Sequence, residues 1–178
     1  MAATVATYVY TGVAPGSGAS ATNIRFKLAD NNTQDSNNPN VKPTVGNNNS
    51  FWKTIALYCT VAPSTAINNV KLYTDGALAW TGCTVYVGDQ MTDTYAQGVV
   101  DPGDADSGYE MTNHSQITTK TDLFTYTSGS PMSITLSASW ANVTGRITMY
   151  VVVQLTMGTT ATGGAQAAET LTWQYDET

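Results

Sequence analysis

The stretch RITMYVVVQLTM, residues 146–157, is the clearest structural signal in the chain. Its side chains alternate between two faces, as they do in a β-strand. One face holds Ile147, Met149, Val151, Val153, Leu155 and Met157, and the other holds Thr148, Tyr150, Val152, Gln154 and Thr156. The stretch therefore predicts a long strand at the centre of a sheet.

The same alternation extends outward from this strand, and no long stretch keeps the 3.6-residue period of a helix. Further strands are expected at residues 4–11, 23–28, 52–61, 70–73, 84–87, 123–127, 133–137 and 169–175. Residues 111–122 could include one short helical turn. About eight short strands separated by Gly, Asn and Pro turns predict an all-β fold, a single antiparallel β-sandwich of immunoglobulin-like or jelly-roll type. The pattern does not choose between these two topologies.

The domain organisation follows from the length and the loops. A chain of 178 residues suits one domain. Residues 1–20 are expected to form an N-terminal arm, made of a strand and the flexible loop GVAPGSGAS, and residues 21–178 the sandwich domain. Residues 30–50 are rich in Asn, Asp and Pro, which compete with sheet hydrogen bonding, so they predict a long Asn-rich surface loop. A loop of that length is a candidate contact element, and the alternative is disorder.

Composition excludes several function classes. Charged residues make up only 11% of the chain, while Thr (30 residues), Gly (15) and Asn (13) supply much of the polarity. The net charge of −6 and the isoelectric point near 4.4 leave no basic field for nucleic acid or anionic lipid. The first 23 residues carry no Lys or Arg, and the longest apolar run, residues 149–153, is far too short to span a bilayer. We expect no nucleic-acid partner, no membrane partner and synthesis in a cytoplasm.

The two cysteines leave two alternatives open. Cys59 falls in an apolar strand pattern, and Cys83 precedes the strand expected at 84–87, so a disulfide is possible if the two strands are neighbours. Reduced thiols are favoured, because the synthesis compartment is reducing and buried Cys usually acts as a small apolar residue.

Catalytic and metal-binding motifs are weak throughout. The acidic loop at 101–110, with Asp101, Asp104, Asp106 and Glu110, could hold paired carboxylates or Ca²⁺, but it lacks the distal ligand of a full calcium loop. Residues 30–35 offer similar ligands at looser spacing. His114 is expected in a turn, because no serine elbow accompanies it, and no Gly-rich phosphate loop is present. We therefore predict no catalytic residue, no cofactor site and no metal site, and hence no enzyme.

Aromatic residues raise a glycan-binding alternative, since sugars stack on exposed rings. The candidates, Phe51, Trp52, Trp80, Trp140 and Trp173, lie at or near strand ends, which favours packing over an open sugar platform. Sequons begin at Asn31, Asn48, Asn113 and Asn142, and they matter only in a eukaryotic secretory pathway, which the N-terminus does not indicate.

Five stretches together resemble a known class of proteins: TNIRFK (22–27), NNVKLYTDG (68–76), VYVGD (85–89), ITTKTD (117–122) and ETLTWQYDE (169–177). They are similar to small structural proteins of tailed bacteriophages and prophage-like elements. The resemblance spans most of the chain from about residue 23, and its motifs are turns and strands rather than an active site.

This resemblance implies a non-enzymatic virion structural protein, and among those a capsid decoration or cement protein. Such a protein would bind the major capsid protein on the capsid exterior and assemble with copies of itself, a trimer being favoured. The N-terminal arm and the loop at 30–50 are the expected contact elements. The alternative is a tail, neck or baseplate component, with possible binding of host glycans.

Overall fold

A computed structural model describes residues 2–14, 16–89, 93–137 and 143–178. The strands are β1 (Thr4–Thr11), β2 (Ser17–Ser20), β3 (Asn47–Asn49), β4 (Lys53–Val61), β5 (Ile67–Tyr73), β6 (Cys83–Gly88), β7 (Val100–Asp101), β8 (Asp104–Gly108), β9 (Lys120–Asp122), β10 (Met132–Ser133), β11 (Gly145–Arg146), β12 (Val151–Gly158) and β13 (Thr172–Glu177). In the described residues, helical structure is limited to two single 3₁₀ turns, η1 (Met111–Asn113) and η2 (Leu123–Thr125). The protein is all-β, as the alternation predicted.

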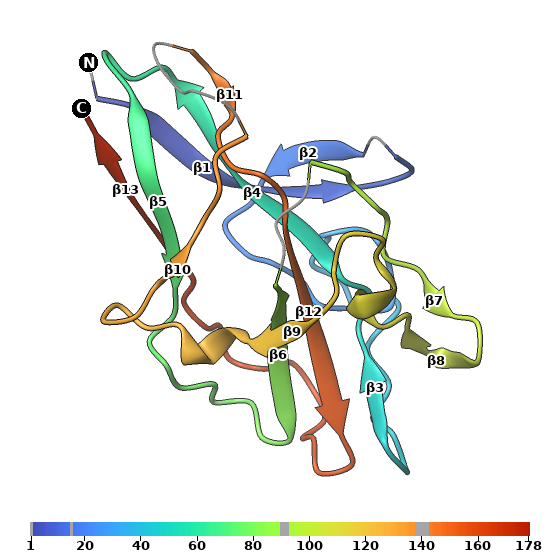
Figure 1. Ribbon diagram of the computed structural model, residues 1–178. Coiled ribbons are helices and arrows are strands. Elements are labelled where there is room, and N and C mark those ends of the chain that lie inside the picture. Colours follow the sequence, from blue (N-terminus) through green and yellow to red (C-terminus); the bar gives the residue numbers. More distant parts are fainter. Residues whose placement is uncertain (1, 15, 90–92, 138–142) are drawn as a thin grey trace.

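All the paired strands run antiparallel, in three sheets. The largest has the order β2-β1-β4-β12-β6-β9, with β11 added to β4 and β3 added to β12 (Figure 1). A second sheet has the order β10-β5-β13, and β7 and β8 form a small hairpin. The two larger sheets have a hydrophobic cluster in common, which is consistent with a sandwich.

This cluster is the main core. It contains Ile55 and Leu57 of β4, Val153 of β12, and Val70 and Leu72 of β5, all at most 2% exposed. Burying each such side chain stabilises the fold by about 1.5–3 kcal/mol. Side chains from two sheets therefore depend on one another for burial.

The strand β12 is buried along both faces, as its central place in the sheet requires. One face contributes to the main core, and on the other Val152 packs with Trp52, Met111 and Ile117. The two faces match those predicted from the sequence. The strand is shorter than predicted, because residues 147–150 lie outside both β11 and β12. There the hydroxyl of Thr148 accepts the Leu57 N–H at 3.1 Å, in place of a backbone carbonyl.

The strand expected at 23–28 does not form. The segment lies across the core with Ile24 and Phe26 packed inward, but its backbone bonds to asparagines instead of a neighbouring strand. The Arg25 N–H donates to Asn32 Oδ1 at 2.7 Å, and Asn40 Nδ2 donates to the Phe26 carbonyl at 3.0 Å. The Asn-rich loop at 30–50 thus has an ordered inner side, and its last residues form β3.

A second expected strand, at 123–127, begins instead with the 3₁₀ turn η2. The Asp122 side chain accepts the Phe124 N–H at 2.9 Å, and this local bond favours a turn over an extended backbone.

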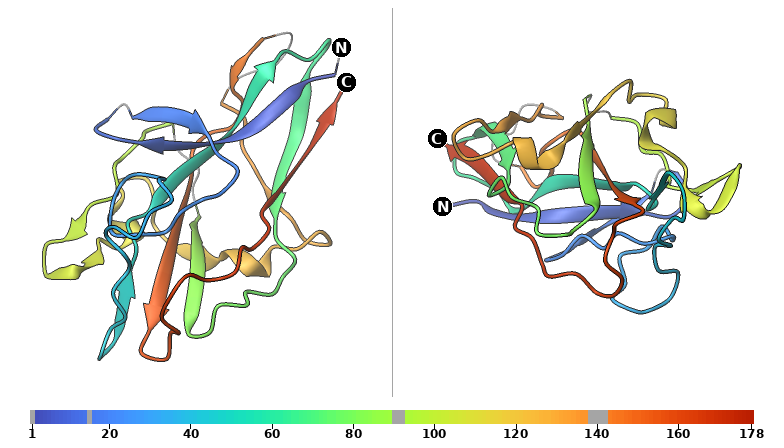
Figure 2. Two further views of the ribbon diagram at one scale, coloured as in Figure 1. Left: turned by 180° about the vertical axis from the view of Figure 1, so that it is seen from behind. Right: turned by 90° about the horizontal axis from the view of Figure 1, so that it is seen from below.

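The predicted N-terminal arm is part of the sheet. β1 pairs with β4 along seven positions and with β2 on its other side, so residues 17–20 form a hairpin strand rather than a flexible loop. The chain ends meet, since the Ala3 N–H donates to both carboxylate oxygens of Glu177 at 2.9 Å. Figures 1 and 2 place both termini at one end of the molecule, and the β1–β2 turn, the β7–β8 hairpin and the loop entering β3 are spaced along the side away from them.

Candidate functional site

The carboxylates of the acidic loop at 101–110 do not come together in one site. Asp104 and Asp106 lie on the β7–β8 hairpin, where Asp101 Oδ1 accepts the Gly103 N–H at 2.7 Å and Asp104 Oδ1 accepts the Asp106 N–H at 2.9 Å. The carboxylate of Glu110 pairs with Lys120 at 2.6 Å. Within the described ranges, no three His, Cys, Asp or Glu side chains come together in a way that could hold a metal ion.

A buried network stands at the start of the Asn-rich loop. The Lys53 side chain is fully buried and donates to the carbonyls of Ala29 and Asn31 at 2.5 and 3.0 Å. Burial lowers the pKa of Lys53 to about 8, although the nearby Asp30 carboxylate acts in the opposite direction. Asp30 accepts the Tyr95 hydroxyl at 3.2 Å, and burial raises its pKa. Each group has a partner within the protein, so the network holds the loop in place.

His114 ends the turn η1, as expected of a turn residue, but its side chain is buried. Nδ1 accepts the Gln116 N–H at 3.2 Å, and the ring meets Trp52 edge-on with centroids 5.9 Å apart. Burial lowers its pKa, which favours the neutral ring. No hydroxyl nucleophile is bonded to it among the residues that the structure describes.

The aromatic candidates for glycan stacking are mostly engaged in packing. Trp52 is buried and donates from Nε1 to the Ala96 carbonyl at 2.9 Å. Trp173 donates to Thr7 Oγ1 at 3.0 Å, and Phe51 is half-buried. Trp140 lies outside the described residues, as does the sequon start Asn142. Among the other sequon starts, Asn48 is buried, Asn31 is half-buried and Asn113 is exposed.

The cysteines are both free, as favoured from the sequence. Cys59 is fully buried and Cys83 is half-buried, and burial raises the pKa of both thiols.

Four exposed valines lie on three segments that project away from the termini, and we call this group the valine end. Val13 is 80% exposed in the turn between β1 and β2, and Val45 is 85% exposed just before β3. Val99 and Val100, where the chain enters β7, are 41% and 45% exposed. In Figure 1 these segments project away from the termini and are spread along the molecule, from the β1–β2 turn at the upper right to the loop entering β3 at the bottom. Exposed apolar residues on projecting turns are suited to contact with another protein surface.

The valine end was not recognised in the sequence. A signal was present, because Val13 and Val45 are single apolar residues inside Gly-, Pro- and Asn-rich segments, where no core position explains them. Both fall within the segments expected to make contacts, 1–20 and 30–50.

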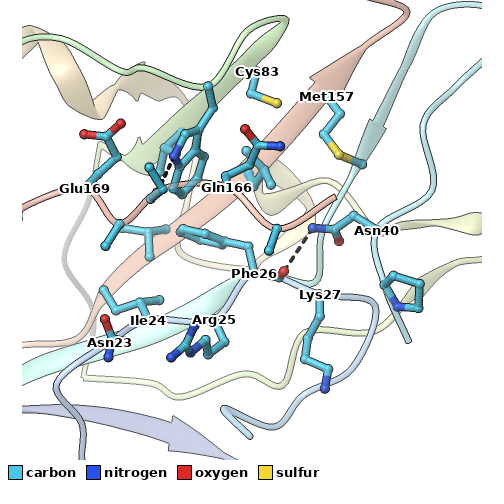
Figure 3. A pocket seen from close by; sticks show the side chains of 18 of the residues that line it. Asn23, Ile24, Arg25, Phe26, Lys27, Asn40, Cys83, Met157, Gln166 and Glu169 are labelled. Atoms are coloured by element: carbon cyan, nitrogen blue, oxygen red, sulfur yellow. Dashed lines mark hydrogen bonds between the residues drawn. The ribbon is translucent and has the colours of Figure 1, made fainter. Parts of the chain in front are cut away.

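A cavity of about 810 Å³ lies between residues 21–27, residues 161–171 and the core face of β6 and β12. We call it the core cavity. Figure 3 shows Phe26 reaching into it, with Cys83 and Met157 on the far side and Asn40 beside it. The rings of Phe26 and Trp80 meet edge-on with centroids 6.4 Å apart, and Trp80 Nε1 donates to the Ala167 carbonyl at 2.7 Å. Sequence reasoning missed this cavity.

Comparison with protein-family models, with curated proteins and with solved structures finds no match for this chain. No helix within the described ranges has the length and apolar character needed to cross a membrane. The fold alone thus defines an antiparallel all-β protein with two surface features, the valine end and the core cavity.

Proposed function

We propose that this chain is a non-enzymatic virion structural protein of a tailed phage, a capsid decoration or cement protein that binds the major capsid protein on the capsid exterior. The proposal starts from the sequence resemblance to phage structural proteins. The observation that carries it is the valine end, which has exposed apolar side chains on three segments that project away from the chain ends.

The chemistry of this end suits attachment to a shell. Burying an exposed valine in an interface contributes up to about 1.5–3 kcal/mol, and short side chains lose little entropy on binding. With only 11% charged residues, contacts made mainly by apolar and neutral groups are little affected by salt. One copy binds weakly by this means, but many copies cover a shell.

The strand β2 is the candidate element for contacts between copies of the chain. It is the last strand of the large sheet, and all four of its residues are exposed, so its outer edge is open to a neighbouring strand. A closed ring of copies, of which a trimer is our favoured form, would use this edge or the valine end.

The first test is the copy number of this chain relative to the major capsid protein in purified particles, measured by quantitative mass spectrometry. A fixed ratio close to that of the shell subunits supports decoration. A few copies per particle would favour the tail, neck or baseplate alternative, and absence from the particle would refute the virion proposal.

The second test addresses the valine end. Val13→Ser and Val45→Ser are each expected to weaken binding to undecorated capsids about 10-fold, the effect of losing roughly 1.4 kcal/mol. Val61→Ser is the matched control, because Val61 is 38% exposed but pairs with Thr4 near the chain ends. Equal binding by all three variants would refute the assignment of the contact surface.

A further inference from the structure

The floor of the core cavity is formed by apolar side chains that belong to the main core. Val85 of β6, Val153 and Leu155 of β12, and Leu123 of η2 line its floor, and each is at most 6% exposed. Phe26 (Figure 3) and Trp80 also line the cavity. The cavity has a volume of about 810 Å³, is partly open to solvent, and has polar groups around its apolar floor.

The cover of the cavity carries mostly small side chains. Residues 162–168 have the sequence TGGAQAA, and the one long side chain, Gln166, bonds back to its own segment, where Nε2 donates to the carbonyls of Thr162 and Gly164 at 3.1 and 3.2 Å. The opposite wall, residues 21–27, is held by asparagine side chains instead of a sheet, as described above. A ligand that fills the space gains the dispersion contacts and the burial that the protein itself lacks.

Charge at the cavity rim is opposite in sign to that of the whole protein. Three of the seven basic residues, Arg25, Lys27 and Lys42, line the cavity, against two of the thirteen acidic residues, Asp35 and Glu169. Asp35 is already paired with Lys27 at 2.7 Å. The rim therefore favours an anion although the net charge is −6.

Two rim cations are available to such an anion. Lys42 is exposed and makes no ion pair with any described residue. The guanidinium of Arg25 bonds to the neutral side-chain oxygen of Gln34 at 3.0 Å and keeps other N–H groups for a ligand. Charged hydrogen bonds of this kind are stronger than neutral ones.

One buried acceptor at the cavity has no partner. Asn40 donates to the Phe26 carbonyl, but its Oδ1 is buried without a hydrogen bond. A buried polar atom left unpaired costs about 1–3 kcal/mol, and because this oxygen is inaccessible to solvent, a ligand supplies the missing donor only if the Asn40 side chain moves. Asn40 lies beside Phe26 at the cavity (Figure 3).

We propose that the core cavity binds an anionic amphiphile of the fatty-acyl class, with its apolar chain on the core face of β6 and β12 and its acidic head at Lys42 and Arg25. The size matches that of ligand pockets, which are commonly about 300–1,000 Å³. This binding is separate from attachment to a capsid and does not depend on it.

The test is a fluorescence titration of the full chain with a dansyl-labelled undecanoic acid. Saturable one-to-one binding is expected, with displacement by myristate and none by dodecyltrimethylammonium, whose head is cationic. Lys42→Glu is expected to weaken binding about 10-fold, or about 1.4 kcal/mol. Lys71→Glu makes the same charge change on β5, outside the cavity lining, and is expected to change binding less than about 2-fold.

Cys83 gives a second measurement, because its thiol lines the cavity while Cys59 is fully buried elsewhere in the core. Saturating myristate is expected to slow alkylation of Cys83 by N-ethylmaleimide at least 5-fold, and the alkylated protein is expected to lose the dye. Absence of saturable binding would overturn the proposal. So would equal displacement by the cationic amphiphile, or binding that neither protects Cys83 nor responds to Lys42→Glu, since the dye would then bind elsewhere.

Discussion

Replacing Gln154 by leucine tests how the centre of the large sheet holds the loops around it. The Gln154 side chain is fully buried in β12. Its Nε2 donates to the carbonyls of Ser50 and Tyr109 at 2.7 and 2.8 Å, and its Oε1 accepts the Met111 N–H at 2.8 Å. Leucine has a similar volume and no polar atom, so three buried backbone groups would lose their partner.

The expected cost can be worked from these three groups. Each buried group left unpaired costs roughly 1–3 kcal/mol, and the added apolar burial of leucine offsets part of the sum. We expect Gln154→Leu to lower the free energy of unfolding by about 3–5 kcal/mol, a large share of the roughly 5–15 kcal/mol of an ordinary domain. The denaturant dependence should be unchanged, because the same surface unfolds.

Urea unfolding followed by tryptophan fluorescence measures this change. Gln174→Leu is the matched control, because Gln174 is exposed on β13, and its effect should stay within about 0.5 kcal/mol. A loss below about 1 kcal/mol for Gln154→Leu would contradict the reasoning, since water or a rearranged loop would then be satisfying the three groups.

Three further predictions concern charge and backbone contacts. Burial lowers the pKa of Lys53 from 10.5 to about 8, so between these two pH values the unfolded chain binds more protons than the folded protein. The free energy of unfolding should therefore rise by about 1–2 kcal/mol between pH 7.5 and 9.5. Urea unfolding of Lys53→Met should show no such rise. A Cβ at Gly108 would overlap the Ser50 carbonyl, so Gly108→Ala should cost about 1–3 kcal/mol in thermal unfolding, unlike Gly163→Ala, where the space is open. Although burial alone would raise the pKa of Asp89, hydrogen bonds from two threonines lower it to about 2. The stability that Asp89 contributes above pH 3.8 is therefore lost as the pH falls toward 2. Asp89→Asn should lower the free energy of unfolding by about 1 kcal/mol at pH 7 and reduce its dependence on pH in acid.

Each of these has a clear contrary result. A wild-type protein whose stability is constant from pH 7.5 to 9.5, or a Lys53→Met variant that keeps the rise, would contradict the lowered pKa. Equal melting of both glycine variants would contradict the close contact at Gly108. An Asp89→Asn protein that unfolds in acid as the wild type does would show that this carboxylate is not the group responsible.

Side-chain alternation predicted burial more reliably than it predicted strands. Ile24 and Phe26 pack against the core as the pattern indicated, although their segment is not a strand. Burial depends on which side chains face inward, whereas a strand also needs a neighbouring backbone. Distant partners decide the second requirement: Asn32 takes the N–H of Arg25, and Thr148 takes that of Leu57.

The surface features were harder to predict, for two different reasons. Val13 and Val45 are visible in the sequence as apolar residues in polar turns, but only the fold shows that their segments project away from the termini. The core cavity is covered by residues 162–168, whose side chains are mostly small. The path of that segment over β6 and β12 is set by contacts far away in sequence, such as that of Trp80 with Ala167. No local pattern contains this information.

The meeting of the chain ends has a consequence for how the fold can be used. Because Ala3 and Glu177 are in direct contact, the chain enters and leaves the fold at one point. The fold could therefore be inserted into a loop of a host protein through two short linkers without stretching either partner. A peptide or enzyme fused at either end would extend away from the β1–β2 turn and the β7–β8 hairpin, which project on the other side of the molecule (Figure 1).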